Sequence, residues 1–440
     1  MPTHNEIMTA WRSLSSNGTP PSPEVSAKVL PEWSVGIDDW QDRLVNTYLR
    51  DYCVGGEEGS RGNSHFKLVI AGYGGGKTHF LHAFRHRALE EGFAVCYIQC
   101  KKDEVSFDDW MGLYSMIAQS IRLPGIDGQG IAKIVETARD NITSRTSSSP
   151  NPDAAFNAIL EDLQWLDYPS TVFLDVMTKA IRLRHDRQDP QLYRVAVTWL
   201  QDGQRKTGPE DMKKLGVAKL AQKQLSAFGR EMFYSLVRFV TEFGGAKGLV
   251  LLMDETDTMF SAKGKALERL LAALRTTIDQ SDDRIDSIPV FGLFAAVPEI
   301  NGQMQTNYAA LYQRFSVIVP FHEGNDNAAQ IDLEQLSEPR KLLAAIGYKL
   351  VNFASLALRH EFDRELQRKN VETLVEVAEE RVFANVDSRR LFVKTWCAFL
   401  DEQHRRGERL YDAADVNNAF QGTYQGIKEE EEENDTEDDG

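Results

Sequence analysis

Residues 68–81, LVIAGYGGGKTHFL, carry the clearest structural signal in the sequence. Four apolar residues break into a run of glycines, and the glycines lead into a lysine, a threonine and a helical pattern. Glycines let successive backbone N–H groups turn toward a phosphate, and the N-terminus of the following helix adds partial positive charge. The stretch therefore predicts a buried strand, a phosphate-binding loop and a helix, in that order.

The register of this loop follows a known pattern except at its start. Counted from Ala71 the loop reads A-G-Y-G-G-G-K-T, so alanine stands where G-x-x-x-x-G-K-[ST] begins with glycine. In this register Lys77 would reach the β- and γ-phosphates of ATP, and the Thr78 hydroxyl would ligate Mg²⁺. A glycine turn that binds no phosphate needs neither side chain here. The residues expected to contact the nucleotide are Gly72, Tyr73, Gly74, Gly75, Gly76, Lys77, Thr78 and His79.

A second apolar run, LVLLMDE at residues 249–255, ends in two carboxylates. Asp254 at the tip of the strand would hold the Mg²⁺ shell, and Glu255 would polarise the attacking water as the catalytic base. An ordinary strand with an acidic turn would look the same in isolation. Its occurrence together with the phosphate loop favours a site for ATP hydrolysis.

Two arginines further along the chain could complete such a site. In YQRFSVIVPF, residues 312–321, Arg314 precedes the last predicted strand, from which it could reach the γ-phosphate of a neighbouring subunit in a homo-oligomer. In ANVDSRRLFVKT, residues 384–395, Arg389 opens a helix and could close a helical lid over the nucleotide. A surface arginine in a salt bridge is the alternative for each.

Five short apolar runs are typical of fully buried parallel strands. They lie at residues 65–72, 93–100, 248–257, 287–299 and 315–321. The fold class expected is therefore α/β, a P-loop NTPase with a parallel sheet flanked by helices. The chain divides into an extended segment (1–35), a P-loop ATPase domain (36–327) with a helical insertion at about 106–245, an all-helical lid domain (328–427) and a disordered acidic tail (428–440).

The formal net charge of −16 is unevenly distributed. Residues 429–440 hold nine acidic residues and no basic ones, a composition that favours disorder. Residues 181–230 hold eleven Lys or Arg against five Asp or Glu. This surplus could contact double-stranded DNA, or it could be the solvated faces of inserted helices.

The remaining composition indicates a cytoplasmic protein. No apolar run reaches the ~20 residues that would span a bilayer, so no membrane association is expected. The N-terminus lacks the basic start and apolar core of a signal peptide. Four cysteines in 440 residues make no disulfide framework, and Cys96 and Cys100 are expected to be buried thiols rather than metal ligands.

These elements together resemble the AAA+ ATPases, near the origin-recognition and loader-type branch. More narrowly, GYGGGKTHFLHAFRHRALEEGFAVCYIQC resembles the ATP-binding proteins of BREX phage-defence systems, the BrxD-like group, and His79, Phe80 and Leu81 match that group's loop. The resemblance implies ATP hydrolysis by a motor or switch that acts with other defence-system proteins on DNA. A slow-turnover regulatory scaffold that binds protein partners is the alternative.

Two features depart from the wider AAA+ pattern. The fourth strand normally ends in a polar residue that senses the γ-phosphate, but here Ala296 and Val297 occupy that position. Glu299 or Asn301 would have to substitute, unless the role is absent. Lys77 and Asp254 are also 177 positions apart, a long separation for one nucleotide domain, which is why an insertion is expected.

Overall fold

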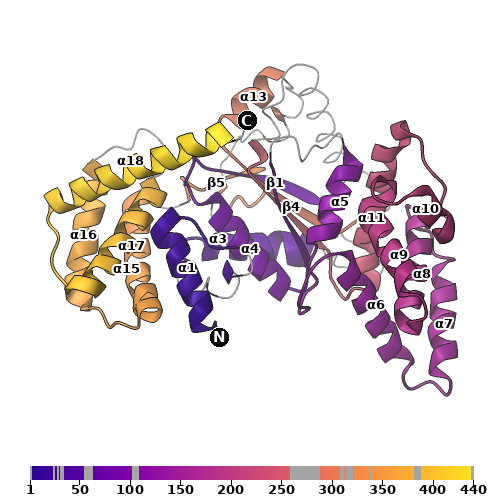
Figure 1. Ribbon diagram of the computed structural model, residues 1–440. Coiled ribbons are helices and arrows are strands. Elements are labelled where there is room, and N and C mark those ends of the chain that lie inside the picture. Colours follow the sequence, from indigo (N-terminus) through magenta and orange to yellow (C-terminus); the bar gives the residue numbers. More distant parts are fainter. Residues whose placement is uncertain are drawn as a thin grey trace.

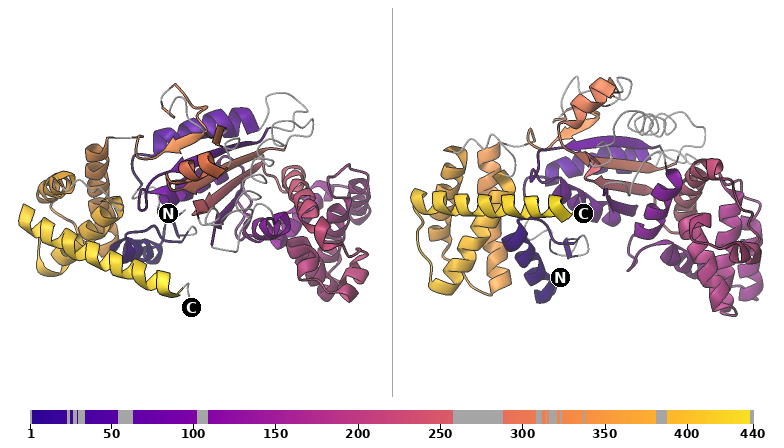
Figure 2. Two further views of the ribbon diagram at one scale, coloured as in Figure 1. Left: turned by 90° about the horizontal axis from the view of Figure 1, so that it is seen from above. Right: turned by 45° about the horizontal axis from the view of Figure 1, so that its top comes forward.

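The structure is a computed structural model. It describes residues 2–437 except 23–24, 27–28, 30–33, 54–62, 102–108, 258–287, 308–311, 314, 316–320, 323, 337 and 381–387. A central sheet carries a helical insertion (residues 110–242) at one end and a helical bundle (residues 339–437), called the lid below, at the other (Figure 1). The two additional views in Figure 2 show the same separation of insertion and lid.

Within the described residues the sheet has five parallel strands in the order β2-β3-β4-β1-β5. The strands are β1 (His65–Ile70), β2 (Ala94–Gln99), β3 (Leu249–Asp254), β4 (Val290–Ala296) and β5 (Gln330–Asp332). Ile70 is paired with Ala296 and Gln99 with Asp254, so the strands end together at one edge. This arrangement confirms the predicted α/β class and places the loop after β1 beside the carboxylates after β3.

Alternating residues of each strand pack on opposite faces of the sheet, which explains the uninterrupted apolar runs. On one face Val69 of β1 packs in a core with residues of α4 (Lys77–Glu90), α3 (Asp38–Leu44) and the π-helix η1 (Val45–Cys53). On the other face Leu68 belongs to the core shared with the insertion. Both faces of the sheet are therefore covered.

The fifth strand differs from the prediction. It is β5 at Gln330–Asp332, whereas the expected run 315–321 has Phe315 in helical conformation and residues 316–320 outside the described residues. Leu68 and Ile70 of β1 pair with the two ends of β5. Three residues, two of them polar, produce no apolar run, so this strand has no recognisable sequence pattern.

The insertion, from Trp110 to Glu242, consists of helices joined by short connections. Its helices are α5 (Trp110–Ser120), α6 (Ile131–Thr146), α7 (Pro152–Leu163), α8 (Thr171–Asp186), α9 (Pro190–Asp202), η2 (Gly203–Arg205), α10 (Pro209–Leu215), η3 (Gln222–Gln224) and α11 (Leu225–Glu242). Short polar residues cap several of them, for example Asn151 and Asp189, each followed by proline at the first helical turn. A Cβ on Gly229 would come within 2.5 Å of the Met111 backbone, so only glycine lets α11 pack this closely on α5.

The lid consists of α15 (Pro339–Leu358), α16 (Arg364–Glu380), α17 (Ser388–Arg406) and α18 (Ala413–Glu437), and the short α13 (Ile300–Asn307) follows β4. Within the described residues, α15 is long and apolar enough to span a membrane. Its buried residues, including Leu350 and Phe353, pack against α16 and α17 in the lid core. Because α15 packs in the lid core, its apolar composition is that of a core helix.

Both ends of the chain differ from the sequence-based expectation. Residues 1–35 are not simply extended, because α1 (His4–Asn17) packs against α15 and α17 of the lid (Figure 1). The indole Nε1 of Trp11 donates to Asp401 at 2.9 Å. A capping box between Thr3 and Glu6 starts α1, and these residues were its sequence signal. At the other end, α18 remains helical through Glu437, where a disordered tail was expected from residue 428.

Candidate nucleotide-binding site

A cavity of about 390 Å³ lies at the edge of the sheet where the strands end. The phosphate loop and the carboxylates after β3 form one side, and the N-terminal segment and the lid form the other. The predicted site residues that line it are Tyr73, Gly74, Gly76, Lys77, Thr78, His79, Asp254, Glu255 and Arg389. Residues more than 300 positions apart in the chain therefore meet in one cavity.

The loop backbone explains its glycines. Gly74 and Gly76 have φ of 67° and 89°, which L side chains rarely adopt. Gly75 has ordinary φ, but a Cβ there would lie 2.5 Å from the Cβ of Ala71 and 3.0 Å from the carbonyl oxygen of Gly72. α4 begins directly after Gly76, so its N-terminal N–H groups face the cavity side of the loop.

Lys77 is held by its own loop. Its Nζ donates to the carbonyl oxygens of Ala71 and Gly72, each at 2.9 Å. Burial lowers the pKa of the Lys77 ammonium, and the nearby carboxylates Asp257 and Asp254 oppose that effect. The ammonium is thus a partly desolvated cation at the mouth of the loop, where an anionic ligand would find it.

Asp254 and Glu255 are fixed by two residues of β2 that sequence reasoning missed. The hydroxyl of Tyr97 donates to Asp254 Oδ2 at 2.9 Å, and the backbone N–H of Glu255 donates to Asp254 Oδ1 at 3.0 Å. The amide of Gln99 donates to Glu255 Oε2 at 3.1 Å. Gln99 ends β2 in register with Asp254, and a polar residue at that point of a neighbouring strand was the available signal.

The environment of Glu255 is strained and partly desolvated. Its φ of 54° lies in the left-handed region, which non-glycine residues seldom occupy. Burial raises the pKa of its carboxyl, and the hydrogen bond from Gln99 opposes the increase. Burial likewise raises the pKa of Asp257, a third carboxyl lining the cavity. A raised pKa and an outlying backbone conformation are both common at functional sites.

Arg389 connects the lid to the loop. Its Nη1 donates to the carbonyl oxygen of Gly75 at 2.6 Å, and its Nη2 donates to the carbonyl oxygen of Leu333 at 3.1 Å. Burial lowers the pKa of the guanidinium. The structure thus brings the arginine at the start of α17 into direct contact with the phosphate loop.

His79 connects the loop helix to the N-terminal segment. Its Nε2 lies 3.1 Å from the Ser34 hydroxyl. Burial, with a contribution from the charge of Arg389, lowers the pKa of His79 to about 4, so the ring is neutral at physiological pH. This histidine is therefore a packing and hydrogen-bonding element beside the loop.

The other predicted site residues lie elsewhere. Arg314 is outside the described residues. Ala296 ends β4, and Val297 after it is buried. Asn301 in α13 exchanges amide hydrogen bonds with Gln330 of β5, the shorter at 2.8 Å. The charge of Glu299 contributes to the raised pKa of Asp257, so Glu299 acts electrostatically on this group of carboxylates.

A five-stranded parallel sheet with a glycine loop between β1 and α4, opening on a cavity at the ends of the strands, defines a P-loop nucleotide-binding protein of the α/β class. Residues 56–412 match the family model of the BREX system ATP-binding protein BrxC/D, and the chain belongs to this family. It is an ATP-binding protein of a BREX phage-defence system, as the resemblance implied. No curated protein and no solved structure matches the chain.

Proposed function

We propose that this protein hydrolyses ATP with Mg²⁺ in the cavity described above and acts in the cytoplasm as a motor or switch among other BREX proteins. The observation that carries the proposal is the convergence of Lys77, the Asp254–Glu255 pair and Arg389 on one cavity. Binding alone requires only the loop. A carboxylate pair beside it and an arginine above it are what phosphoryl transfer to water additionally needs.

Each residue has a role that its contacts support. Lys77 exchanges its two loop carbonyls for phosphate oxygens, which are stronger partners because they are charged. Thr78 and Asp254 are suited to hold Mg²⁺, since both are oxygen ligands at the cavity wall. The metal would neutralise phosphate charge when bound. Glu255 accepts the proton of the attacking water, and Arg389 leaves Gly75 to contact the γ-phosphate.

The half of the cavity away from the loop suits an adenine base. It is formed by Val35 and Ile37 of the N-terminal segment and by Leu342, Ile346 and Leu350 of α15. Apolar walls with a few polar groups are typical of sites that bind planar rings. ATP placed this way would touch the sheet domain, the N-terminal segment and the lid together.

A slow-turnover scaffold is the alternative, and two observations favour it. The amide of Gln99 donates to Glu255 Oε2 and lowers the pKa of its carboxyl, which makes Glu255 a weaker base than burial alone would. The end of β4 is apolar at Ala296, which offers no side-chain contact to a γ-phosphate. Under this alternative a single copy of the protein turns ATP over slowly. Fast turnover would need an arginine from another copy, such as Arg314 in a homo-oligomer.

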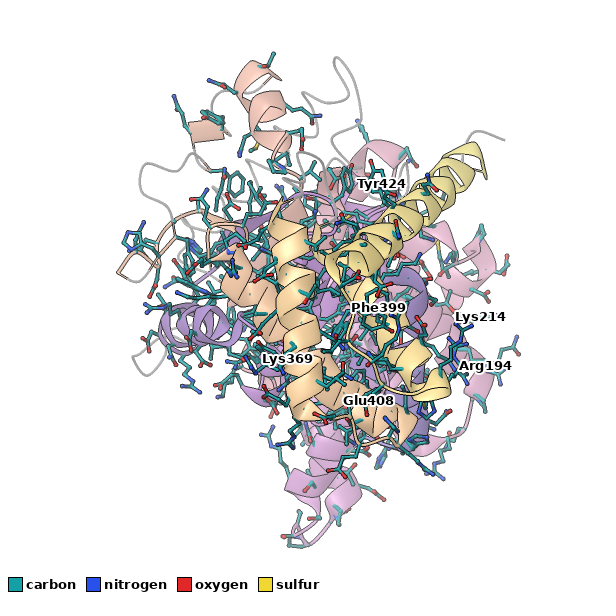
Figure 3. The ribbon with its side chains drawn as sticks, turned by 90° about the vertical axis from the view of Figure 1, so that its left-hand side faces the viewer. Arg194, Lys214, Lys369, Phe399, Glu408 and Tyr424 are labelled. Atoms are coloured by element: carbon teal, nitrogen blue, oxygen red, sulfur yellow. The ribbon has the colours of Figure 1, made fainter. Side chains whose placement is uncertain are left out.

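Double-stranded DNA is a proposed partner on one face of the insertion. Arg194 of α9 and Lys214 of α10 project on the same side in Figure 3, and the two helices pack together. Lys179 of α8 donates to the carbonyl oxygen of Lys214 at 2.8 Å, and Lys213 is exposed beside it. Lys214 also pairs with Asp211 at 3.1 Å, which offsets part of its charge. Several cations on one face could each neutralise a phosphate, and every such contact would add to the salt dependence of binding.

Steady-state ATPase measurements with and without duplex DNA test the proposal. We expect Mg²⁺-dependent turnover that Glu255→Gln abolishes while ATP binding is retained. Turnover in Glu255→Gln within a factor of two of the unmodified protein would instead support the scaffold. Stimulation by DNA that disappears at high salt would support the DNA contact.

A further inference from the structure

The connection between β5 and α15 touches both the phosphate loop and the lid arginine. Glu334 Oε1 accepts from the backbone N–H of Gly72 at 3.0 Å. The carbonyl oxygen of the preceding residue, Leu333, accepts from Arg389 Nη2 at 3.1 Å. Neither residue belongs to a sequence motif. Among the described residues of this connection, Glu334 is the one whose charged side chain hydrogen-bonds to the phosphate loop.

Hydrogen bonds to β1 and within the turn hold this connection in place, independently of the phosphate loop and Arg389. Leu333 donates its N–H to the carbonyl oxygen of Ile70 at 2.9 Å, which extends the pairing of β5 with β1. Asp332 closes the turn, because its Oδ1 accepts from the N–H of Glu334 at 3.0 Å and its Oδ2 accepts from the Gln335 amide at 2.6 Å. The Glu334 carboxylate is therefore presented to the loop by a fixed turn.

The charge of Glu334 acts on the two cations of the site. It counters the effect of burial on the pKa of Lys77 and also on that of Arg389, for which it is the largest opposing charge. ATP and ADP bring phosphates that compete for the same cations. A carboxylate beside them weakens the attraction for phosphate, whereas its hydrogen bond to Gly72 keeps the loop in shape.

We propose that Glu334 is a positioning residue that anchors the phosphate loop through Gly72 and, by its negative charge, speeds the release of ADP. The proposal rests on the cavity being the ATP site. It assigns two separable effects to one side chain: the hydrogen bond strengthens nucleotide binding, and the charge weakens it. Turnover that is limited by ADP release would then depend on this residue although it touches neither the attacking water nor the metal.

Three variants separate the two effects. Glu334→Gln keeps an oxygen that accepts from Gly72 and removes the charge, while Glu334→Ala removes both. Glu338→Gln is the matched control, because it removes one charge from the same connection, where Glu338 pairs with Lys341 at 2.6 Å. The readouts are the dissociation rate and affinity of a fluorescent ADP analogue, measured by stopped flow at low and high salt, with thermal melting to verify folding.

We expect Glu334→Gln to release ADP roughly two- to five-fold more slowly than the unmodified protein, the range for a partly exposed charge interaction, and the difference to shrink at high salt. Glu334→Ala should bind ADP more weakly than Glu334→Gln. Release from Glu334→Gln that equals release from Glu338→Gln overturns the electrostatic effect, and equal affinity of the Gln and Ala variants overturns the anchoring effect. Failure of the ATP site itself is recognised separately, by unchanged nucleotide binding in Lys77→Ala.

Discussion

The contact between Gly75 and Ala71 predicts an unusual result for a conservative change in the loop. In Gly75→Ala the new methyl group would lie 2.5 Å from the Ala71 Cβ and 3.0 Å from the Gly72 carbonyl oxygen, so the loop must move by roughly 1 Å to restore ordinary contact. Displacements of that size at a reacting site cost on the order of 10²-fold in rate. We expect a similar order of loss in ATP affinity, measured by calorimetry, and a lower melting temperature.

A second substitution tests the cause. Ala71→Gly removes the closer of the two contacts, so Ala71→Gly combined with Gly75→Ala should recover part of the lost affinity, with the Gly72 carbonyl contact limiting the recovery. Gly422→Ala in α18 is the control, because a Cβ there meets nothing within 4 Å. ATP affinity in Gly75→Ala within a factor of two of the unmodified protein would contradict this steric effect, as would a double variant no better than the single one.

Three further predictions concern the same site and the insertion. Lys77→Ala should abolish calorimetric ATP binding with an unchanged melting temperature, because the loop loses the cation that faces the phosphates. Glu255→Gln should bind ATP and lose about 10²-fold or more in turnover. Burial raises the pKa of Glu255, so ATPase activity of the unmodified protein should fall at a higher pH on acidification than it would if this base were an exposed glutamate. Replacing Lys213 and Lys214 by Glu should weaken duplex binding equally for all DNA sequences and flatten the salt dependence of binding. Deleting residues 429–440 should tighten duplex binding. If neither the full-length nor the tail-less protein shifts duplex DNA in a gel at low salt, the DNA contact is ruled out.

The parts of the site that lie next to each other in sequence were predictable. The glycine loop and the carboxylates after β3 are local patterns at the ends of buried strands, and the parallel sheet brings those ends together. The family resemblance rested on the same loop and is confirmed. The arginine at the start of α17 was identified by its place in the helical region, and the structure brings it to the loop.

The parts that depend on tertiary contacts were not predictable. Gln99, Tyr97 and Glu334 carry no motif, and each acquires its role only from the strand or loop it faces. β5 is too short and too polar to form a hydrophobic pattern. α1 was hidden by the composition of the segment around it, although its capping box was present. Arg314 lies outside the described residues, so its action on a neighbouring subunit stays a prediction.

The packing of α1 on the lid has a consequence for how the chain is made. Trp11 and its partner Asp401 are 390 residues apart, so the apolar side of α1 leaves the ribosome long before the helices that cover it. At 5–20 residues per second this delay is roughly 20 to 80 s. Leu14 of α1 and Leu350 of the lid both form walls of the nucleotide cavity, which is therefore completed only after most of the chain has been translated. Chains that terminate early would keep the phosphate loop but lack the lid, so they could not close the cavity around ATP.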